Sequence, residues 1–528
     1  MTGDWPSIPA LVRSAAATHA GREAVIDGDG SLSYPELFEQ AQRFAGAVVS
    51  CGLAPGERVG IWTYNSVEWI VAALGLWQAG CVLVPVNTRF KGGEAADILG
   101  RSGVRLLVTV TDFLGTDYVG LLGDAQLPVL DTIVVAAGNV PQGAESWASF
   151  MARGKTEAQS EAGRRAAALG LEDPSDILFT SGTTGRPKGV VQTHGRTLRV
   201  GTDWVAMTGL QPGDRYLMVN PYFHMFGLKA GILASIAAGA TMLPQAVFDL
   251  DAVLTRVEGE KVTVLPGAPT LYQSILDHPG RADYDLSTLR VAVTGAADIP
   301  VELIRRVREE LPFSLVVTGY GLTEAGTATA TSPEDDATLV ATTVGRPRPG
   351  FELRIADDKG TDVVPGVAGE ILLRGGSVMS HYLDDAEATE AALSVDGWLR
   401  TGDLGTVDDR GFLRVVGRSK EMFIVGGFNV YPAEVENLLL EHPGVARAAV
   451  IGIPDRRLGE VGMAFVVPRP GASVDTPDMV EWARSRMANY KVPRFIEVVD
   501  ELPLNATGKV EKDVLRRRQS AASRRAAP

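Results

Sequence analysis

The sequence has few of the residues that form disulfide scaffolds, metal clusters or nucleic-acid-binding surfaces. It contains only two cysteines, Cys51 and Cys81, both in apolar segments, so we expect buried thiols and a reducing cytoplasm rather than a disulfide. Two cysteines and six scattered histidines are too few to form a metal cluster from these side chains. The net charge of −14 disfavours nucleic acid as the main partner.

Long apolar runs are also missing. The most apolar long stretch, residues 69–86, contains Gly75, Gln78, Gly80 and Pro85. It therefore predicts a core helix that runs into a strand, rather than a membrane span. The N-terminus has no basic or apolar leader pattern, so no signal peptide is expected. The chain has 528 residues, 45% of them hydrophobic, and is too long to fold around a single hydrophobic core, so we expect several domains.

A loop rich in glycine and hydroxyl side chains lies between two short apolar runs, residues 177–179 and 190–191. Its glycines allow the backbone to approach a ligand closely, while its hydroxyls, backbone N–H groups and lysine can bind phosphate oxygens. Because Lys188 is followed by Gly189, the loop is not of the Walker type. The pattern favours a phosphate-binding loop over a polar surface turn. The residues expected to bind the nucleotide there are Thr180, Ser181, Gly182, Thr183, Thr184, Gly185 and Lys188.

Strands and helices alternate over the first 340 residues, which predicts an α/β fold with parallel sheets covered by helices. Apolar periodicity predicts helices at 35–51 and 68–78, and strands at 58–62, 82–86, 106–110 and 132–135. Further strands are expected at 216–219, 263–265, 291–294 and 315–318. In open parallel sheets ligands bind beyond the carboxyl ends of strands, so the loops after the last three, 266–269, 295–297 and 319–321, are expected to face one site.

The pattern changes after about residue 340. Short hairpin-like strands predict a small β-rich subdomain up to residue 418. An α+β pattern follows, with a hairpin at 422–431 and a helix opened by Pro432.

Four more motifs accompany the phosphate-binding loop in this order: Tyr320-Gly321-Leu322-Thr323-Glu324, Gly397-Trp398-Leu399-Arg400-Thr401-Gly402-Asp403, Gly417-Arg418-Ser419-Lys420 and Leu504-Asn505-Ala506-Thr507-Gly508-Lys509.

These five motifs resemble, in the same order, those of the adenylate-forming superfamily, which includes acyl-CoA synthetases, peptide-synthetase adenylation domains and beetle luciferases. The resemblance covers nearly the whole chain. It implies an enzyme that joins a carboxylate to the α-phosphate of ATP, releases pyrophosphate and passes the acyl group to a thiol. It also implies an AMP-binding domain at 1–418, a small mobile domain at 419–515 that carries the catalytic lysine, and a basic flexible tail at 516–528.

The resemblance assigns roles around the nucleotide. Glu324 and the Thr180 hydroxyl resemble the Mg²⁺ position, although Glu324 alone would be an ordinary loop carboxylate. Asp403 matches the carboxylate that binds the ribose hydroxyls, and Arg418 matches its cationic partner; without Arg418, Asp403 would suggest only a turn. The adenine is expected to contact Tyr320 by stacking and the neighbouring positions Gly295, Ala296, Ala297, Gly321 and Thr323.

The same resemblance makes Lys509 the catalytic cation for adenylation, with a solvated lysine as the plain alternative. An ammonium on a flexible stem can reach both the attacking carboxylate and the α-phosphate. The hinge is expected at Lys420, about which the small domain rotates between the half-reactions. That rotation would bring Gly426, Gly427 and Phe428 to the CoA thiol. CoA is favoured over a carrier-protein thiol because the join after Arg418 is short and no carrier domain follows.

The acid is expected to lie beside an aromatic segment, residues 221–227, in which His224 gates or positions it; a core histidine is the alternative. The expected acyl pocket contains Trp204, His224, Phe226, Gly227, Lys229, Gly295, Ala325 and Gly326. Lys229 interrupts an apolar run, and we expect it to extend to the surface rather than to meet a polar group on the acid. The segment around it resembles actinobacterial synthetases for ring-derived propanoates of steroid breakdown, with medium-chain fatty acids as the other substrate class.

The overall prediction is therefore a cytoplasmic acyl-CoA synthetase that uses ATP, Mg²⁺ and CoA. No nucleic-acid partner or stable membrane insertion is expected, and a homodimer stays open. Two other classes remain: an enzyme that loads a carrier protein and accumulates acyl-AMP, and a non-catalytic nucleotide-binding relative. The presence of Lys509, Glu324 and Asp403 favours an active enzyme over the non-catalytic relative.

Overall fold

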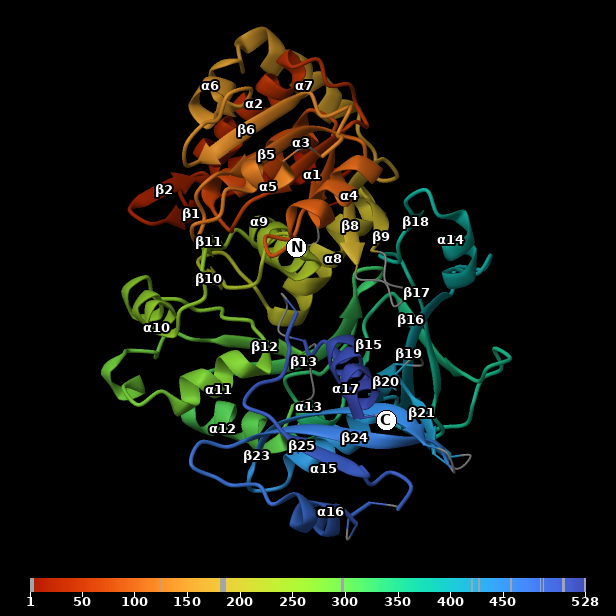
Figure 1. The fold of residues 1–528 in the computed structure, drawn as a ribbon. Helices are drawn as coiled ribbons and strands as arrows, with labels where there is room; N and C mark the ends of the chain where they lie inside the picture. Colours follow the sequence, from red (N-terminus) through yellow and green to blue (C-terminus); the bar gives the residue numbers. More distant parts are fainter. Residues whose placement is uncertain are drawn as a thin grey trace.

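The computed structural model places the N-terminal segments at one end of the molecule and the C-terminal segments at the other (Figure 1). The structure describes residues 4–123, 125–180, 187–295, 299–418, 421–425, 428–455, 458–484, 486–487, 489–505 and 509–526. Within these ranges, no helix is long and apolar enough to cross a membrane.

The largest sheet has eight strands in the order β18-β9-β8-β4-β3-β5-β6-β7. The strands from β8 to β7 run parallel, and β9 and β18 add an antiparallel edge. The central strands are apolar and buried because helices cover both faces. This confirms the strands predicted between residues 58 and 135. The bounds are β3 (Arg58–Trp62), β4 (Val82–Pro85), β5 (Val104–Val110), β6 (Thr132–Ala137), β7 (Glu145–Ser146), β8 (Pro174–Thr180), β9 (Lys188–Thr193) and β18 (His381–Tyr382).

Two four-stranded sheets, β10-β11-β1-β2 and β12-β13-β14-β15, are joined edge to edge through one residue. Val264 forms parallel bridges to Tyr216 and to Val291, so the strand predicted at 263–265 is reduced to a single bridging residue. The bounds are β1 (Glu23–Asp27), β2 (Gly30–Ser33), β10 (Arg215–Met218), β11 (Thr241–Pro244), β12 (Val291–Gly295), β13 (Leu315–Leu322), β14 (Gly326–Ala330) and β15 (Arg346–Pro347).

Helices cover these sheets, and local sequence explains several of their ends. The helix predicted at 35–51 forms one residue earlier and begins with a capping box, in which Ser33 and Glu36 bind each other's backbone N–H groups. The bounds are α1 (Ile8–Thr18), α2 (Tyr34–Ser50), α3 (Val67–Gln78), α4 (Gly92–Arg101), α5 (Tyr118–Leu122), α6 (Trp147–Ala152), α7 (Thr156–Ala168), α8 (His194–Thr208), η1 (Phe226–Leu233), α9 (Ala234–Ala238), α10 (Leu250–Gly259), α11 (Pro269–Asp277), η2 (Arg281–Asp283), α12 (Val301–Glu310), α13 (Ala337–Thr342) and α14 (Ala386–Ala392).

The chain after residue 350 forms the two units that the pattern change predicts. The first is an antiparallel sheet with the order β16 (Phe351–Ala356), β17 (Gly369–Gly375), β19 (Leu399–Val407) and β20 (Leu413–Arg418). The second is a five-stranded sheet with helices. Its elements are β21 (Phe423–Val425), β22 (Phe428–Val430), α15 (Pro432–Leu440), β23 (Val445–Asp455), β24 (Gly459–Pro468), α16 (Thr476–Arg484), β25 (Phe495–Val498) and α17 (Lys512–Ala526).

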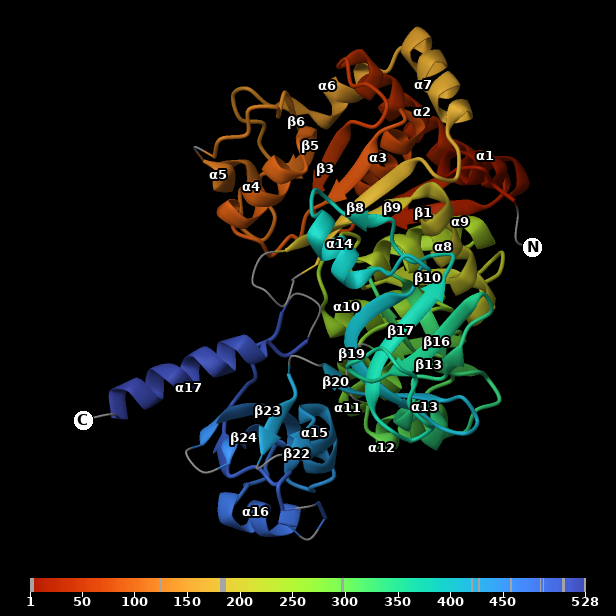
Figure 2. The same ribbon diagram turned by 90° about the vertical axis from the view of Figure 1, so that its right-hand side faces the viewer.

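The last helix differs from the sequence-based expectation. A flexible tail is predicted at 516–528, whereas α17 continues to Ala526 and projects away from the rest of the molecule (Figure 2). The reason is local, because residues 512–526 contain no glycine or proline and are rich in alanine and arginine, which are strong helix formers.

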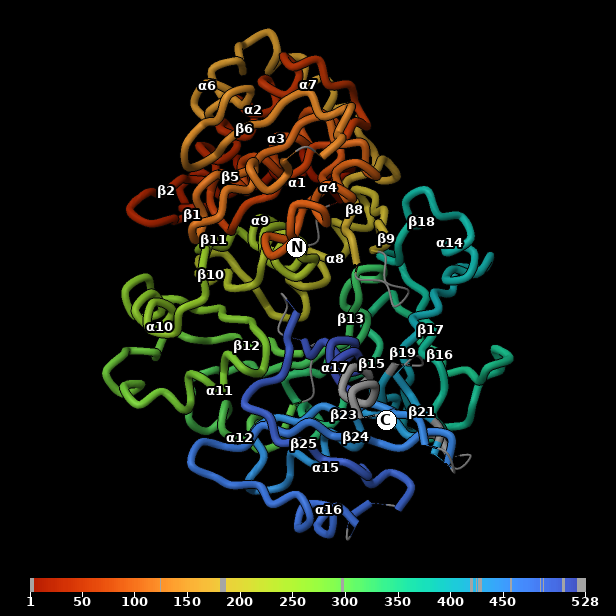
Figure 3. The backbone as a smooth tube through the Cα atoms, in the orientation of Figure 1, coloured from red at the N-terminus to blue at the C-terminus, as the bar shows by residue number. Residues whose placement is uncertain are grey.

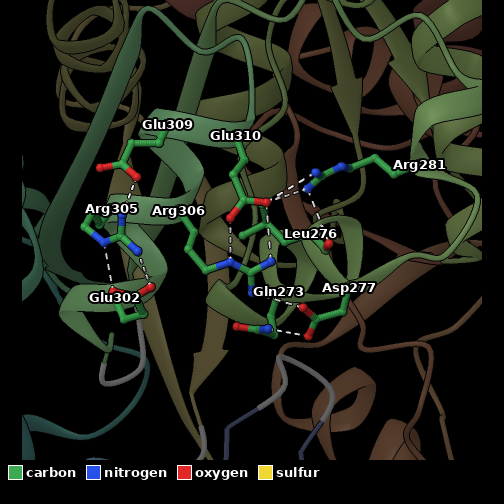
Figure 4. Close-up of polar contacts among 9 residues, drawn as sticks. All are labelled: Gln273, Leu276, Asp277, Arg281, Glu302, Arg305, Arg306, Glu309 and Glu310. Atoms are coloured by element: carbon green, nitrogen blue, oxygen red, sulfur yellow. Dashed lines mark hydrogen bonds and ion pairs between the residues drawn. The ribbon is translucent and has the colours of Figure 1, made fainter.

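A network of exposed ion pairs joins α12 to α11 and η2 (Figure 4). Arg306 on α12 pairs with Asp277 on α11 at 3.0 Å and with Glu310 at 2.7 Å. Arg281 on η2 also pairs with Glu310, at 3.2 Å. Each exposed pair contributes at most about 1 kcal/mol, so the network serves mainly to fix how the helices lie against one another.

A buried ion pair fastens η1, a π-helix, to the largest sheet. The Lys229 ammonium lies 2.8 Å from Asp176 Oδ2 on β8, with side chains 1% and 0% exposed. Asp176 Oδ1 accepts hydrogen bonds from Ser175 and Thr197. Burial lowers the pKa of Lys229, and Asp176 opposes this shift. The expectation that Lys229 extends to the surface is wrong, because the Asp176 carboxylate on β8 balances its charge inside the protein.

We expect Asp176→Asn to lower the free energy of unfolding by about 3–5 kcal/mol, because it leaves the buried Lys229 ammonium without its counter-charge. Urea unfolding followed by tryptophan fluorescence measures this loss. The matched control is Lys261→Met, which breaks an exposed pair with Asp285 and is expected to cost less than about 1 kcal/mol. Similar losses in the two variants would contradict a structural role for the buried pair.

Candidate active site

The residues predicted to bind adenine and ribose lie on strands of two different sheets. The Tyr320 hydroxyl on β13 donates a hydrogen bond of 2.5 Å to Asp403 Oδ2 on β19. Asp403 is directly opposite Arg418 in the pairing of β19 with β20. The Tyr320 side chain is nearly buried, with 9% of its surface exposed. The structure therefore brings Tyr320, Asp403 and the backbone of Arg418 together, although they are far apart in the sequence.

The glycines beside Tyr320 lie in a strand and not in the predicted loop. Residues 319–321 are predicted as a loop, but β13 continues through them and pairs with β14, with a bulge between Tyr320 and Gly321. A Cβ atom on Gly319 would lie 2.8 Å from the Thr329 carbonyl, and one on Gly321 would lie 2.5 Å from the Gly326 carbonyl. These glycines are therefore required by the close approach of β14.

Gly295 ends β12 next to β13. Its φ of +158° is near the extended limit, and a Cβ atom there would lie 3.0 Å from the Gly319 carbonyl. The turn after β13 is held from two sides: Gln192 Nε2 donates to the Thr323 carbonyl at 3.4 Å, and the Ser377 hydroxyl donates to the Ala325 carbonyl at 2.7 Å. The predicted position Gly295 thus lies beside β13, whereas Thr323 and Ala325 lie in the turn that joins β13 to β14.

A second group of residues surrounds the expected phosphate side. Tyr382 on β18 donates a hydrogen bond of 2.9 Å to Glu324 Oε1. The Lys188 ammonium lies 4.8 Å from the centre of the Tyr382 ring, a distance typical of a cation–π contact. Lys188 is opposite Thr180 in the pairing of β9 with β8. Tyr382 therefore links Glu324 to the strand pair that flanks the phosphate-binding loop.

Sequence reasoning missed Tyr382. Its two-residue strand gives no periodic signal, and its role becomes visible only through the pairing of β18 with β9. Burial and the neighbouring Glu324 raise the pKa of the Tyr382 phenol. The hydroxyl therefore stays protonated and acts as a hydrogen-bond donor toward the carboxylate.

The expected acyl side is built around η1 and α8. The rings of Trp204 and Phe226 meet edge to face, with centroids 5.0 Å apart. Gly227 touches the preceding turn, because a Cβ atom there would lie 2.2 Å from the Pro221 carbonyl. Gly326 has a φ of +75° and lies against α8, where a Cβ atom would meet Val200 at 2.6 Å. Lys229 turns away from this group toward Asp176, as described above.

His224 lies at the start of this segment. Its Nδ1 atom accepts a hydrogen bond from the Phe226 N–H at 3.2 Å. Burial, and secondly the positive charge of Lys509, lower the pKa of His224 to about 4. The imidazole is therefore neutral at physiological pH. The charge of Lys509, which belongs to the C-terminal unit, therefore contributes to this shift in addition to burial.

Lys509 is presented by a short loop before α17. Its N–H donates to Asn505 Oδ1 at 2.9 Å, and its carbonyl accepts the Asn505 N–H at 2.8 Å. The Glu511 N–H donates to the Pro503 carbonyl, which closes the loop. Figure 3 shows the segment before α17 leaving the C-terminal sheet and rising toward the middle of the molecule. The predicted positions that lie outside the described residues are Ser181, Gly182, Thr183, Thr184, Gly185, Ala296, Ala297, Lys420, Gly426 and Gly427.

Comparison with known proteins finds relatives over almost the whole chain. A ligase for 3-[(3aS,4S,7aS)-7a-methyl-1,5-dioxo-octahydro-1H-inden-4-yl]propanoyl:CoA from Rhodococcus jostii is 47% identical and covers 98% of this chain and 99% of its own. The protein of the same name from Mycobacterium tuberculosis is 49% identical, with coverage of 98% and 99%. The crystal structure of an anthranilate CoA ligase with anthranoyl-AMP superposes with a TM-score of 0.89 at 28% identity, covering 98% of each chain.

Two protein-family models together match most of the chain. The model of the AMP-binding enzyme family matches residues 12–383, and that of the AMP-binding enzyme C-terminal domain matches residues 434–509. The fold and the enzyme class implied by the five motifs are thereby confirmed. The chain belongs to the AMP-binding enzyme family.

Proposed function

We propose that this chain is an ATP-dependent acid–CoA ligase whose acid is a propanoate carrying an alicyclic, steroid-derived ring. Two relatives of 47% and 49% identity over almost the whole chain are ligases of that description, which supports both the CoA thiol and the ring-bearing acid. They favour CoA over a carrier-protein thiol. The anthranilate CoA ligase supports the adenylate intermediate, since its crystal structure contains anthranoyl-AMP.

The observation that carries the proposal is the hydrogen bond from Tyr320 to Asp403, which joins the positions expected to bind adenine and ribose. The charge of Lys509, from the C-terminal unit, also acts on His224 in the aromatic segment beside which the acid is expected. Joining a carboxylate to ATP brings two anions together, and a positioned ammonium stabilises the charge that builds up during the attack. The neutral His224 adds no charge of its own and orients the segment through its bond to the Phe226 N–H.

The other residues hold the nucleotide in line with the acid. Asp403 would accept hydrogen bonds from the ribose hydroxyls, while the Tyr320 hydroxyl fixes the orientation of that carboxylate. Lys188 would neutralise the leaving pyrophosphate from its position beside Tyr382. Positioning of this kind removes much of the entropic barrier to the first half-reaction.

The residues present fit a magnesium ion bound together with ATP. Mg²⁺ is commonly held by one or two protein oxygens, waters and substrate phosphates. Glu324 supplies a carboxylate oriented by Tyr382, and Thr180 supplies a hydroxyl opposite Lys188. Among the described residues no cluster of three or more histidine, cysteine or acidic side chains exists, so a site completed by ATP is the arrangement that fits. When bound, the ion would neutralise phosphate charge.

We further propose that the structure represents the arrangement for adenylation, with a boundary between the domains near residue 418. Transfer to CoA would then require the C-terminal unit to rotate about Lys420 and withdraw Lys509. We expect the enzyme to act in the cytoplasm.

The direct test is a product assay with purified enzyme, ATP, MgCl₂ and CoA. Bicyclic diketone propanoate and octanoate are supplied separately, and products are identified by mass spectrometry. We expect acyl-CoA from the bicyclic acid at a kcat/KM at least about 10-fold higher than from octanoate, because a ring fills a pocket that a flexible chain leaves partly empty. A preference for octanoate, or acyl-AMP that persists with CoA present, would contradict the proposal.

Lys509→Ala is expected to lower acid-dependent ATP–pyrophosphate exchange by about 10²–10³-fold, because it removes the cation that stabilises the attack. Transfer to CoA from supplied acyl-AMP should change little, since Lys509 withdraws for that step. Both half-reactions are measured on the same preparation, with Lys261→Met as the control. Equal loss in the two half-reactions would show that Lys509 is not specific to adenylation.

The pKa of His224 is expected to respond to the charge of Lys509. NMR titration of labelled histidine in the wild type is expected to give a pKa of about 4, below the ordinary value of 6.5. Because the folded state binds the proton more weakly, His224 reduces stability as the pH falls from 6.5 to 4. Lys509→Ala should raise the pKa part of the way toward 6.5, since burial remains. An unchanged pKa would mean that the two side chains do not meet.

A further inference from the structure

A second lysine of the C-terminal unit forms a buried cluster directly behind the loop that carries Lys509. Lys512 is the first residue of α17, and its side chain is only 12% exposed. Its ammonium lies 2.8 Å from Glu436 Oε1 on α15 and 3.0 Å from Glu421 Oε2. Both carboxylates raise the pKa of Lys512, although burial lowers it. The cluster therefore contains a charged ammonium held by two carboxylates.

The same cluster reaches a fourth segment. Glu436 Oε1 also accepts the backbone N–H of Val450 on β23 at 2.6 Å. One ammonium thus joins the start of α17 to α15, to the C-terminal sheet and to the segment before β21. Glu421 is the first described residue after the expected hinge, so it stands at the beginning of the C-terminal unit.

Lys512 lies close to Lys509 in the chain, so the cluster can affect the position of Lys509. Lys509 is three residues earlier, and the segment that contains it is closed by the bond from the Glu511 N–H, next to Lys512, to the Pro503 carbonyl. A buried ion pair is rarely more stabilising than a well-packed apolar replacement. This one holds the start of α17 against α15, β23 and the segment before β21 at the same time. The place where Lys512 is held therefore limits where Lys509 can lie.

We propose that Lys512 is a positioning residue for the adenylation step. Its ion pairs fix the position of the segment that carries Lys509, and the pair with Glu421 connects that segment to the residue that follows the hinge. Lys509 then moves together with the C-terminal unit when the unit rotates about the hinge. This inference rests on the proposed function, in which Lys509 acts in adenylation and withdraws before transfer to CoA.

The test compares Lys512→Met and Lys512→Arg with the control Arg518→Met, which alters an exposed arginine on the same helix. For each variant, ATP–pyrophosphate exchange, transfer to CoA from supplied acyl-AMP and the pKa of His224 are measured. We expect Lys512→Met to lower the kcat of exchange about 10- to 100-fold, the cost of a small misplacement of a catalytic group. Transfer to CoA should stay within about two-fold of the wild type, and Lys512→Arg should restore most of the exchange.

The pKa of His224 separates positioning from simple loss of stability. In Lys512→Met it should rise from about 4 toward 6.5, because Lys509 no longer stays beside the ring, while Arg518→Met leaves it unchanged. Normal exchange, or equal loss in both half-reactions, would overturn the proposal. If Lys512→Met does not fold, Glu421→Gln supplies the same comparison. A wild-type enzyme without exchange activity would instead contradict the proposed function itself.

Discussion

In the proposed function, the charge of Lys509 acting on the region of His224 is the interaction on which the arrangement depends. Two anions would have to meet, and the cation proposed to make this favourable comes from a different unit than the groups expected to hold the nucleotide. Catalytic competence would therefore depend on how two parts of the chain lie relative to each other. The orientation of the C-terminal unit would then determine whether adenylation can occur. This is consistent with the several hydrogen bonds that hold the loop before α17.

Two hydrogen bonds organise the rest of the site from β13 and the turn after it. Tyr320 reaches Asp403 at one end, and four residues later Glu324 is reached by Tyr382 at the other. Strands from the large sheet, the β13–β14 pair and the β-rich subdomain are thereby connected through side chains. The nucleotide would lie along a single backbone segment whose two ends are fixed independently.

Much of the fold could be predicted because the relevant signals are local. Apolar periodicity is enough for α2, which begins one residue earlier than predicted. A dense run of glycine and hydroxyl residues predicts the phosphate-binding loop, whose residues 181–186 lie outside the described part of the chain. The misses depend on partners distant in sequence. Lys229 is predicted to reach the surface because its sequence neighbours give no sign of Asp176 on β8. Tyr382 lies beside Lys188 only because β18 pairs with β9. Residues 319–321 form a strand because they pair with β14.

The π-helical winding of η1 has a consequence for how this pocket can change. A π-helix contains one more residue per turn than the α-helix into which it continues, and such insertions often occur at functional sites. Removing one residue would let this wide turn close to α-helical winding and would change which side chains the turn presents, while the helix that follows can keep its direction. Lys229, paired with Asp176 on β8, holds the turn against the sheet. A single deletion could therefore present new side chains to the acid while the nucleotide residues stay in place, a short evolutionary route from one substrate to another.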